Sequence, residues 1–107
     1  MRNEPLKGHL DLLVLACLED GPRHGYAVIE QLLQQSGGFF DLPEGTVYPV
    51  LHRLEKARLL VSRWSTSSGR RRRVYRLTRS GAAALAQQTS QWNQFAQAVA
   101  AVVGGQA

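Results

Sequence analysis

The sequence predicts a mainly α-helical fold with one small β-hairpin, followed by a separate C-terminal helix. Three observations predict it. Apolar residues recur at helical spacing in three successive segments before residue 58. Two short alternating segments around a polar turn come next, and residues 80–107 then contain no charged residue. Since 107 residues with 44% hydrophobic side chains suffice for one modest core, we expect one domain over residues 1–79 and a dimerisation helix over residues 80–107.

The first predicted helix contains the segment LDLLVLACLED and ends at Asp20-Gly21-Pro22. Its main apolar stripe consists of Leu6, Leu10, Leu13, Val14 and Cys17. Other leucines fill the remaining faces, which is typical of a central, buried helix. Cys17 is the single cysteine, so an intramolecular disulfide is excluded and we interpret the thiol as a core side chain.

Two amphipathic helices are predicted next. The segment HGYAVIEQLLQQ places Tyr26, Ile29, Leu32 and Leu33 on one stripe, before a stop at Ser36-Gly37-Gly38. The segment EGTVYPVLHRLEKA, residues 44–57, places Val47, Val50, Leu51, Leu54 and Ala57 toward the core. Its opposite face carries Gly45, Tyr48, Pro49, His52, Arg53 and Lys56. A proline inside a helix costs about 3 kcal/mol, so Pro49 predicts a local kink whose cost is offset by another interaction. Close approach of the helix to another surface would be one such interaction.

A hairpin follows the third helix. LLVSRWS and RRVYRLT are the predicted strands, with Thr66-Ser67-Ser68-Gly69 as the turn. Alternation places Tyr75 and Leu77 on the core face and Val74, Arg76 and Thr78 on the other. Arg70, Arg71, Arg72 and Arg73 form a run, and its last two residues open this second strand.

The charge of the chain is strongly asymmetric. The net charge is +5, ten of the thirteen basic residues lie between Arg53 and Arg79, and no acidic residue follows Glu55. A run of arginines can simply be a solvated surface, but solubilising surfaces usually mix both signs. We therefore favour a polyanionic partner, with nucleic acid first, because guanidinium groups bind phosphate oxygens in pairs.

Three helices followed by a basic hairpin form the outline of a winged helix-turn-helix. In that architecture the third helix enters the major groove of DNA, and the hairpin, or wing, reaches the backbone or the minor groove. The predicted partner is duplex DNA.

Three segments in order make the resemblance to a family specific: GPRHGYAVIEQL, EGTVYPVLHRLEKARLL and GRRRRVYRLTRSG. They resemble the PadR family of bacterial transcriptional regulators, which implies a dimeric repressor or a ligand-responsive regulator. For a dimer, the expected DNA partner is an inverted repeat. The candidate DNA-binding residues are Tyr26, Thr46, Tyr48, Pro49, His52, Arg53, Lys56, Arg70, Arg71, Arg72 and Arg73. Many members open the third helix with a Ser-Pro pair, whereas Leu42-Pro43-Glu44 stands here, so we expect Asp41 or Glu44 to stabilise that helix end.

The last segment predicts a homodimer independently of the resemblance. Leu85, Trp92 and Val99 recur at intervals of seven, with Phe95 and Val102 between them. Thr78 is the expected N-cap, and the helix is expected to end near Gly104-Gly105. The alternative is that this helix packs on its own domain. Trp92 is interpreted first as a packing residue of the dimer interface and second as one wall of a slot for a planar aromatic effector. The second interpretation follows the resemblance, because some PadR members bind aromatic compounds between two protomers.

Other classes of function are disfavoured. The candidate reactive residues His9, Asp11, Cys17, His24 and His52 follow no metal-ligand spacing and no nucleophile motif, so we expect no enzyme activity, no metal and no cofactor. An RNA-binding or protein-interaction winged-helix module stays open as the alternative function. The sequence shows no signal peptide and no membrane-spanning stretch, which predicts a cytoplasmic protein without a membrane partner.

Overall fold

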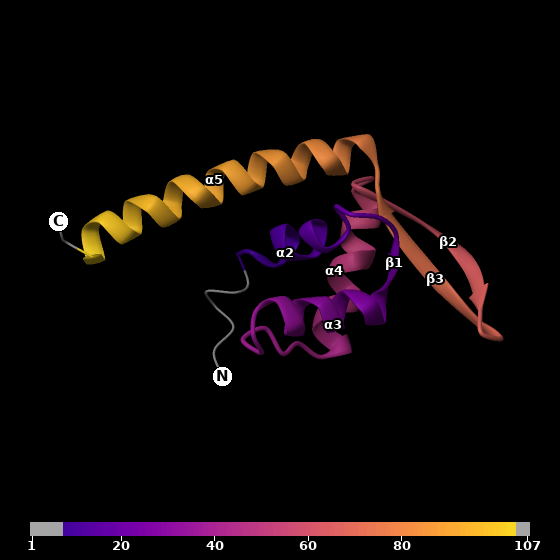
Figure 1. Cartoon of the computed structure of the whole chain (residues 1–107). Coiled ribbons are helices and arrows are strands. Elements are labelled where there is room, and N and C mark those ends of the chain that lie inside the picture. Colours follow the sequence, from indigo (N-terminus) through magenta and orange to yellow (C-terminus); the bar gives the residue numbers. More distant parts are fainter. Residues whose placement is uncertain (1–7, 105–107) are drawn as a thin grey trace.

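A computed structural model of the chain describes residues 8–104, and its elements follow the predicted order (Figure 1). They are α2 (Leu10–Cys17), β1 (Arg23–His24), α3 (Gly25–Gln35), α4 (Glu44–Lys56), β2 (Leu60–Ser67), β3 (Arg70–Leu77) and α5 (Arg79–Gly104). The predicted helix position Leu6 and the predicted terminal residue Gly105 lie outside the described residues. The fold is that of a winged helix-turn-helix with a long C-terminal helix.

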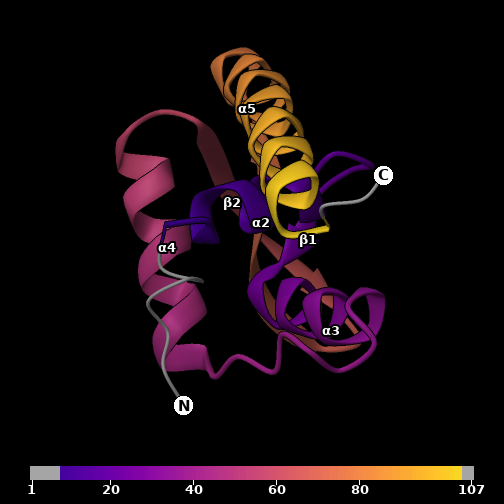
Figure 2. The same cartoon turned by 90° about the vertical axis from the view of Figure 1, so that its left-hand side faces the viewer.

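The helices of the domain surround α2, which contacts α3, α4 and α5. Figure 2 views α5 nearly end-on and shows α2 beneath it, between α4 and α3. Val14 and Leu15 of α2 are fully buried, as are Val47 and Leu51 of α4. The prediction of a central, buried first helix is therefore confirmed.

The sheet has three antiparallel strands in the order β1-β3-β2, and its smallest strand was not predicted. β1 is two residues long, too short to show an alternating pattern, and is recognisable only because His24 pairs with Val74. The predicted four-residue turn is also wrong, because Thr66 pairs with Arg71 and Ser67 pairs with Arg70. The turn is Ser68-Gly69, both at positive φ (53° and 75°), which suits a tight hairpin and places all four arginines in β3.

α4 begins without the cap that Asp41 was expected to supply. Pro43 is the N-cap residue, and no side chain within residues 8–104 caps this end of the helix. Glu44 stands in the first turn, where a carboxylate interacts favourably with the helix dipole. Pro49 lies inside α4, and the helix continues through it to Lys56.

α5 begins inside the domain and then leaves it. Thr78 caps it as predicted: its hydroxyl accepts from the Gly81 N–H at 3.0 Å and donates to the Arg58 carbonyl at 2.8 Å. A Cβ at Gly81 would overlap the carbonyl oxygen of Leu59, so glycine is required for this close approach. Leu85 is only 5% exposed and belongs to the core of its own domain, which corrects its assignment to the dimer face.

The C-terminal part of α5 extends away from the domain on the side opposite to the wing (Figure 1). Its 26 residues correspond to about 39 Å of helix, and the molecule measures 56 × 30 × 21 Å. The predicted dimer residues Trp92, Phe95, Val99 and Val102 are 40%, 58%, 42% and 81% exposed. An apolar row on a projecting helix is unusual for a monomer in water.

Candidate nucleic-acid interface

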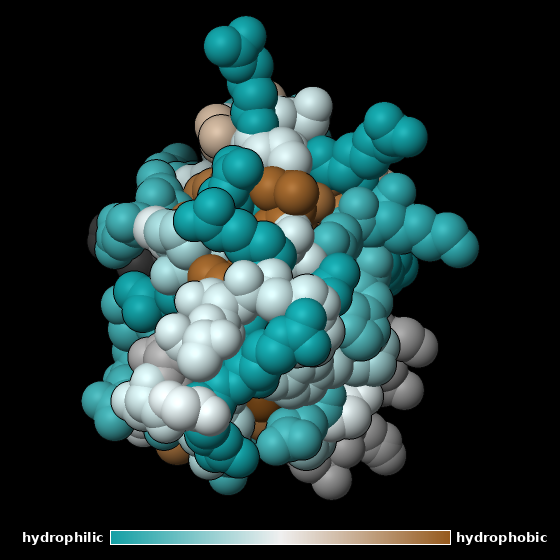
Figure 3. All heavy atoms as spheres, turned by 90° about the vertical axis from the view of Figure 1, so that its right-hand side faces the viewer, coloured by the Kyte–Doolittle hydropathy of each residue, from teal (hydrophilic) through white to brown (hydrophobic). Residues whose placement is uncertain are grey.

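A cleft of about 700 Å³ separates the wing from the N-terminal half of α4 and the start of α3. It is lined by His24, Tyr26, Glu44, Tyr48, His52, Trp64, Arg70, Arg71, Arg72, Arg73 and Tyr75. Figure 3 views the molecule from the side of the wing and shows a mostly hydrophilic surface with small apolar areas between. The cleft thus combines concentrated positive charge with several aromatic rings.

Seven predicted DNA-binding residues line this cleft: Tyr26, Tyr48, His52, Arg70, Arg71, Arg72 and Arg73. The other four, Thr46, Pro49, Arg53 and Lys56, lie on α4 outside this lining. The remaining lining residues, His24, Glu44, Trp64 and Tyr75, were not predicted to belong to the interface. Trp64 could have been found from its place in the predicted wing, whereas the roles of His24 and Glu44 depend on tertiary contacts.

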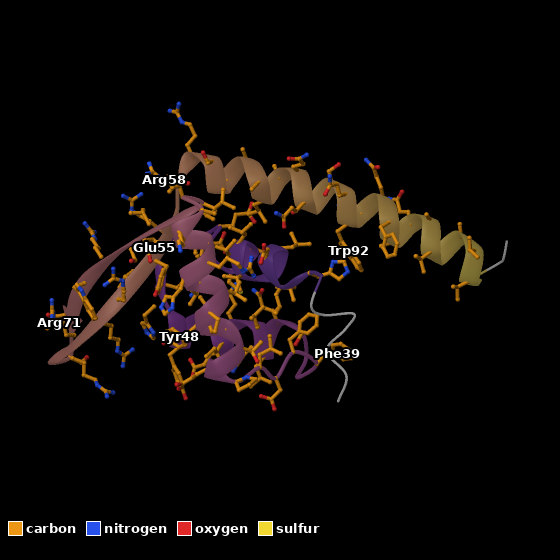
Figure 4. All side chains as sticks on the ribbon, turned by 180° about the vertical axis from the view of Figure 1, so that it is seen from behind. Phe39, Tyr48, Glu55, Arg58, Arg71 and Trp92 are labelled. Atoms are coloured by element: carbon orange, nitrogen blue, oxygen red, sulfur yellow. The ribbon has the colours of Figure 1, made fainter. Side chains whose placement is uncertain are left out.

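Tyr48 and His52 form the side of the cleft that α4 contributes. They are four residues apart in one helix, so their side chains share a face, and their ring centroids are 6.3 Å apart. Tyr48 lies over the backbone of Gly25, where a Cβ would come within 2.5 Å of the tyrosine ring. The missing side chain of Gly25 therefore leaves the space that the Tyr48 ring occupies, and Figure 4 shows Tyr48 on the side of α4 that faces the wing.

The strand geometry divides the arginine run into two pairs. Side chains alternate along β3, so Arg71 and Arg73 share one face and Arg70 and Arg72 share the other. Trp64 is paired with Arg73 across the hairpin, and its ring lies under both Arg71 and Arg73, with Cζ-to-centroid distances of 4.5 and 5.1 Å. These distances are typical of cation–π contacts.

A short hydrogen-bond chain fixes the base of the wing to α4. Arg73 Nε donates to the Ser62 hydroxyl at 2.8 Å, and that hydroxyl donates to Glu55 Oε2 at 2.6 Å. Glu55 is the last carboxylate of the sequence and belongs to α4. The chain sets the position of the wing relative to the third helix.

His24 connects the start of α3 to the wing. Its Nδ1 lies 3.3 Å from the Ala27 N–H, as the N-cap of α3, and its Nε2 lies 2.7 Å from Arg72 Nη1. Burial, followed by the positive charge of Arg72, lowers the pKa of His24, while the negative charge of Glu30 opposes the shift. The neutral imidazole is therefore favoured at this position.

Arg53 is turned toward α2. Its guanidinium donates to both carboxylate oxygens of Asp11, at 2.7 and 2.9 Å, in a bidentate ion pair. The Arg53 side chain is nevertheless 57% exposed. In this state the residue that was predicted to contact DNA is bound to a neighbouring helix.

A second groove, of about 400 Å³, lies where α5 leaves the domain. Trp92 stands edge-on to His9 with ring centroids 4.9 Å apart, and Phe95 follows it at 6.0 Å. Asp11, the partner of Arg53, also lines this groove. The groove therefore adjoins both the exposed apolar row of α5 and the contact between α2 and α4.

Within residues 8–104 no group of three or more histidine, cysteine or acidic side chains is placed to hold a metal ion. Cys17 is buried, and burial raises the pKa of its thiol to about 11, which disfavours the reactive thiolate. In the same part of the chain, no helix has the length and apolarity needed to cross a membrane.

A winged helix-turn-helix with a basic wing beside its third helix defines a class of DNA-binding proteins. The family model described as "Transcriptional regulator PadR-like family" matches residues 14–87, more than half of the chain. The chain belongs to this family, whose members are transcriptional regulators that bind DNA and are not enzymes.

Individual relatives cover most of the chain. The transcriptional regulator Rv3488 of Mycobacterium tuberculosis is 41% identical over 95 residues, which are 89% of this chain and 83% of that protein. A PadR family regulator from Eggerthella lenta has a structure with a TM-score of 0.80 at 31% identity, covering 94% of this chain and 86% of that one. A PadR family regulator from Clostridium difficile reaches a TM-score of 0.74 at 35% identity, covering 87% of this chain and 95% of that one.

Proposed function

We propose that the protein is a homodimeric repressor that binds an inverted repeat in duplex DNA and is released by a planar aromatic effector. The observation that carries the DNA-binding part is the cleft, in which Tyr48 and His52 of α4 face the arginines of β3. In this proposal α4 reads base edges in the major groove while the wing arginines bind phosphates. The protein acts in the cytoplasm, where it meets chromosomal DNA.

The exposed apolar row of α5 supports the proposed dimer. Trp92, Phe95, Val99 and Val102 continue a seven-residue spacing outside the domain core. A second copy related by a twofold axis can cover this row with the same row, as symmetric dimers do. The two copies of α4 then meet successive major grooves, and an inverted repeat is the expected operator.

The effector part rests on Trp92 and its groove. A planar aromatic compound can stack on an exposed indole, and the groove lies beside the proposed dimer contact. Such a compound changes DNA affinity only by binding the two dimer geometries unequally. Acridine and naphthalene derivatives should therefore quench tryptophan fluorescence and weaken DNA binding together. Quenching that survives in Trp92→Phe but disappears in Trp64→Phe would reject this site.

Selection of bound duplexes from a random pool tests the main proposal. We expect enrichment of one inverted repeat, and affinity that falls steeply as salt increases, because arginine-phosphate contacts release counterions. Competition with duplex RNA and with single strands is part of the same experiment. Preference for RNA, or enrichment of no sequence at all, would contradict the proposal and favour an RNA-binding or protein-interaction module.

A further inference from the structure

We infer that Trp64 is a positioning residue of the DNA interface, which holds the guanidinium groups of Arg71 and Arg73 as an ordered pair. The inference rests on the proposed function of the cleft. Trp64 lines this cleft together with both arginines, although its side chain is 51% exposed. A large aromatic side chain exposed on a narrow hairpin buries little apolar surface, so core packing does not account for its position.

The hairpin register brings the three side chains together. Trp64 stands directly opposite Arg73, and Thr66, two residues further along β2, stands opposite Arg71. Arg71 is therefore the diagonal neighbour of Trp64 on the same face of the hairpin, within reach of a long side chain. Both guanidinium carbons lie over the indole ring, at 4.5 and 5.1 Å from its centroid.

Two cations on one face of a strand repel each other, and unsupported arginine side chains sample many rotamers. The negative face of an indole attracts both groups, and tryptophan is the best side chain for this contact. A stacked guanidinium keeps its N–H groups at the edge of its plane, where they can donate to phosphate oxygens. The conformational entropy of the two arginine side chains is therefore lost when the protein folds, and DNA binding does not have to order them again.

One member of the pair is also fixed to α4. Arg73 donates to Ser62, which donates to Glu55 of α4, so the stack has a defined place relative to the third helix. Arg72 points to the other face and contacts His24. The structure therefore assigns the Trp64-dependent phosphate contact to Arg71 and Arg73 and not to the whole arginine run.

The test compares Trp64→Leu and Trp64→Phe with the parent protein on a duplex selected by that parent. Leucine keeps an apolar side chain without a π system, and we expect it to lose about tenfold in affinity, whereas phenylalanine restores part of the loss. Val61→Ala is the matched control, since Val61 points from the opposite face of β2 and is also partly exposed, at 36%. It should change affinity less than twofold. Equal affinities for Trp64→Leu and the parent would overturn the inference.

A double-mutant comparison separates positioning from direct stacking of Trp64 on a base. In an Arg71→Gln, Arg73→Gln background, Trp64→Leu should have no further effect, because there is no guanidinium left to position. A remaining tenfold loss in that background would mean that Trp64 contacts DNA itself, which also overturns the inference. Thermal unfolding of each variant checks that the fold is retained.

A readout without DNA keeps the two proposals distinguishable. In a Trp92→Phe background, Trp64 is the only remaining tryptophan of the chain. Its emission should shift when Arg71 and Arg73 become glutamine, and unchanged emission would contradict the stack. A parent protein that binds no duplex while this shift is present would refute the proposed function and leave the stacking geometry supported.

Discussion

His24 makes two contacts that one neutral imidazole cannot satisfy together. A neutral ring has a single accepting nitrogen, yet both the Ala27 N–H and Arg72 Nη1 are donors directed at it. It can accept from the start of α3 or from the wing, but not from both. A protonated ring would accept from neither and would carry a positive charge beside Arg72.

This arrangement makes the free energy of unfolding depend on pH. The pKa of His24 is lowered in the folded state, mainly by burial and then by Arg72, so the unfolded chain binds more protons below its own pKa of about 6.5. The contribution of His24 to the free energy of unfolding should be fully present above this pH. It should be lost as the pH falls through the pKa of His24 in the folded state. Urea unfolding at a series of pH values measures this dependence.

His24→Gln is the control, because it keeps a polar side chain but cannot titrate. The part of the pH dependence due to His24 should be missing from this variant. Arg72→Gln should move the His24 pKa upward but not to its ordinary value, since burial remains the larger cause. An imidazole titration by NMR that is identical in the parent and in Arg72→Gln would contradict this explanation.

The ion pair with Asp11 holds the Arg53 guanidinium against α2. Asp11→Ala should release the Arg53 guanidinium from α2 beside the DNA-facing side of α4. We expect stronger binding to non-specific duplexes, with a salt slope steeper by about 0.9 if one phosphate contact is gained. Because the pair is largely exposed, the loss in stability should stay near or below about 1 kcal/mol.

Electrophoretic or fluorescence titration at several salt concentrations measures that slope. Asp11→Ala combined with Arg53→Gln is the matched control and should return the slope to the parent value or below. A slope that Asp11→Ala leaves unchanged would indicate that Arg53 reaches DNA while still paired, or that it does not reach DNA at all.

The start of α5 depends on a glycine that no other residue can replace without displacement. Gly81 lies in its first turn, and the carbonyl oxygen of Leu59 occupies the space where a Cβ would be. Because this neighbour is backbone, Gly81→Ala should displace the start of α5 and lower the free energy of unfolding by about 1–3 kcal/mol. Thermal and urea unfolding test this expectation.

Gly45→Ala in α4 is the matched control. A Cβ at Gly45 would have open space around it, so helix propensity alone decides the effect. Alanine should stabilise the protein there by up to about 1 kcal/mol. Equal effects of the two substitutions would contradict the tight contact between α5 and the segment before β2.

At the scale of the whole molecule, the proposed DNA surface and the proposed dimer surface lie at different ends. Figure 4 shows Arg71 on the wing, far from Trp92 on α5. A second copy related by a twofold axis and packed on the outer part of α5 therefore leaves the DNA-binding cleft of each protomer open. The domain of each copy then depends on α5 for its placement relative to the other.

Phe95→Ser combined with Val102→Ser should convert the proposed dimer into a folded monomer. Both side chains lie outside the core, at 58% and 81% exposure, so the unfolding free energy of the monomer should change little. Operator affinity should fall strongly, because half-sites about 34 Å apart need both copies of α4 in one frame. Sedimentation measures the oligomeric state.

Leu85→Ala provides the contrast. Leu85 is buried in the core of its own domain, so its loss should cost about 2–5 kcal/mol in stability. Its effect on association should come only through unfolding. A double-serine variant that still sediments as a dimer would place the interface elsewhere on the chain.

The order of the elements was predictable from periodicity, because helical spacing and strand alternation are local properties. The buried positions Val47, Leu51 and Tyr75 all follow from such patterns. The hairpin was predicted with a turn that is too long. Thr66 and Ser67 are residue types common in turns, but their pairing with Arg71 and Arg70 places them in strand β2. The arginine run, its lack of carboxylates and the three family segments were also readable directly.

Only the tertiary structure decided what each charged and aromatic side chain contacts. Periodicity placed Leu85 and Trp92 at equivalent positions, yet Leu85 is buried in the core of its domain whereas Trp92 is 40% exposed. The sequence could not show that Arg53 binds Asp11, because the two are 42 residues apart. Pairing across such separations depends on how helices dock. The sequence therefore determined the helices, the hairpin and the sign of the charge, whereas docking decided the short strand β1 and which arginines face the cleft.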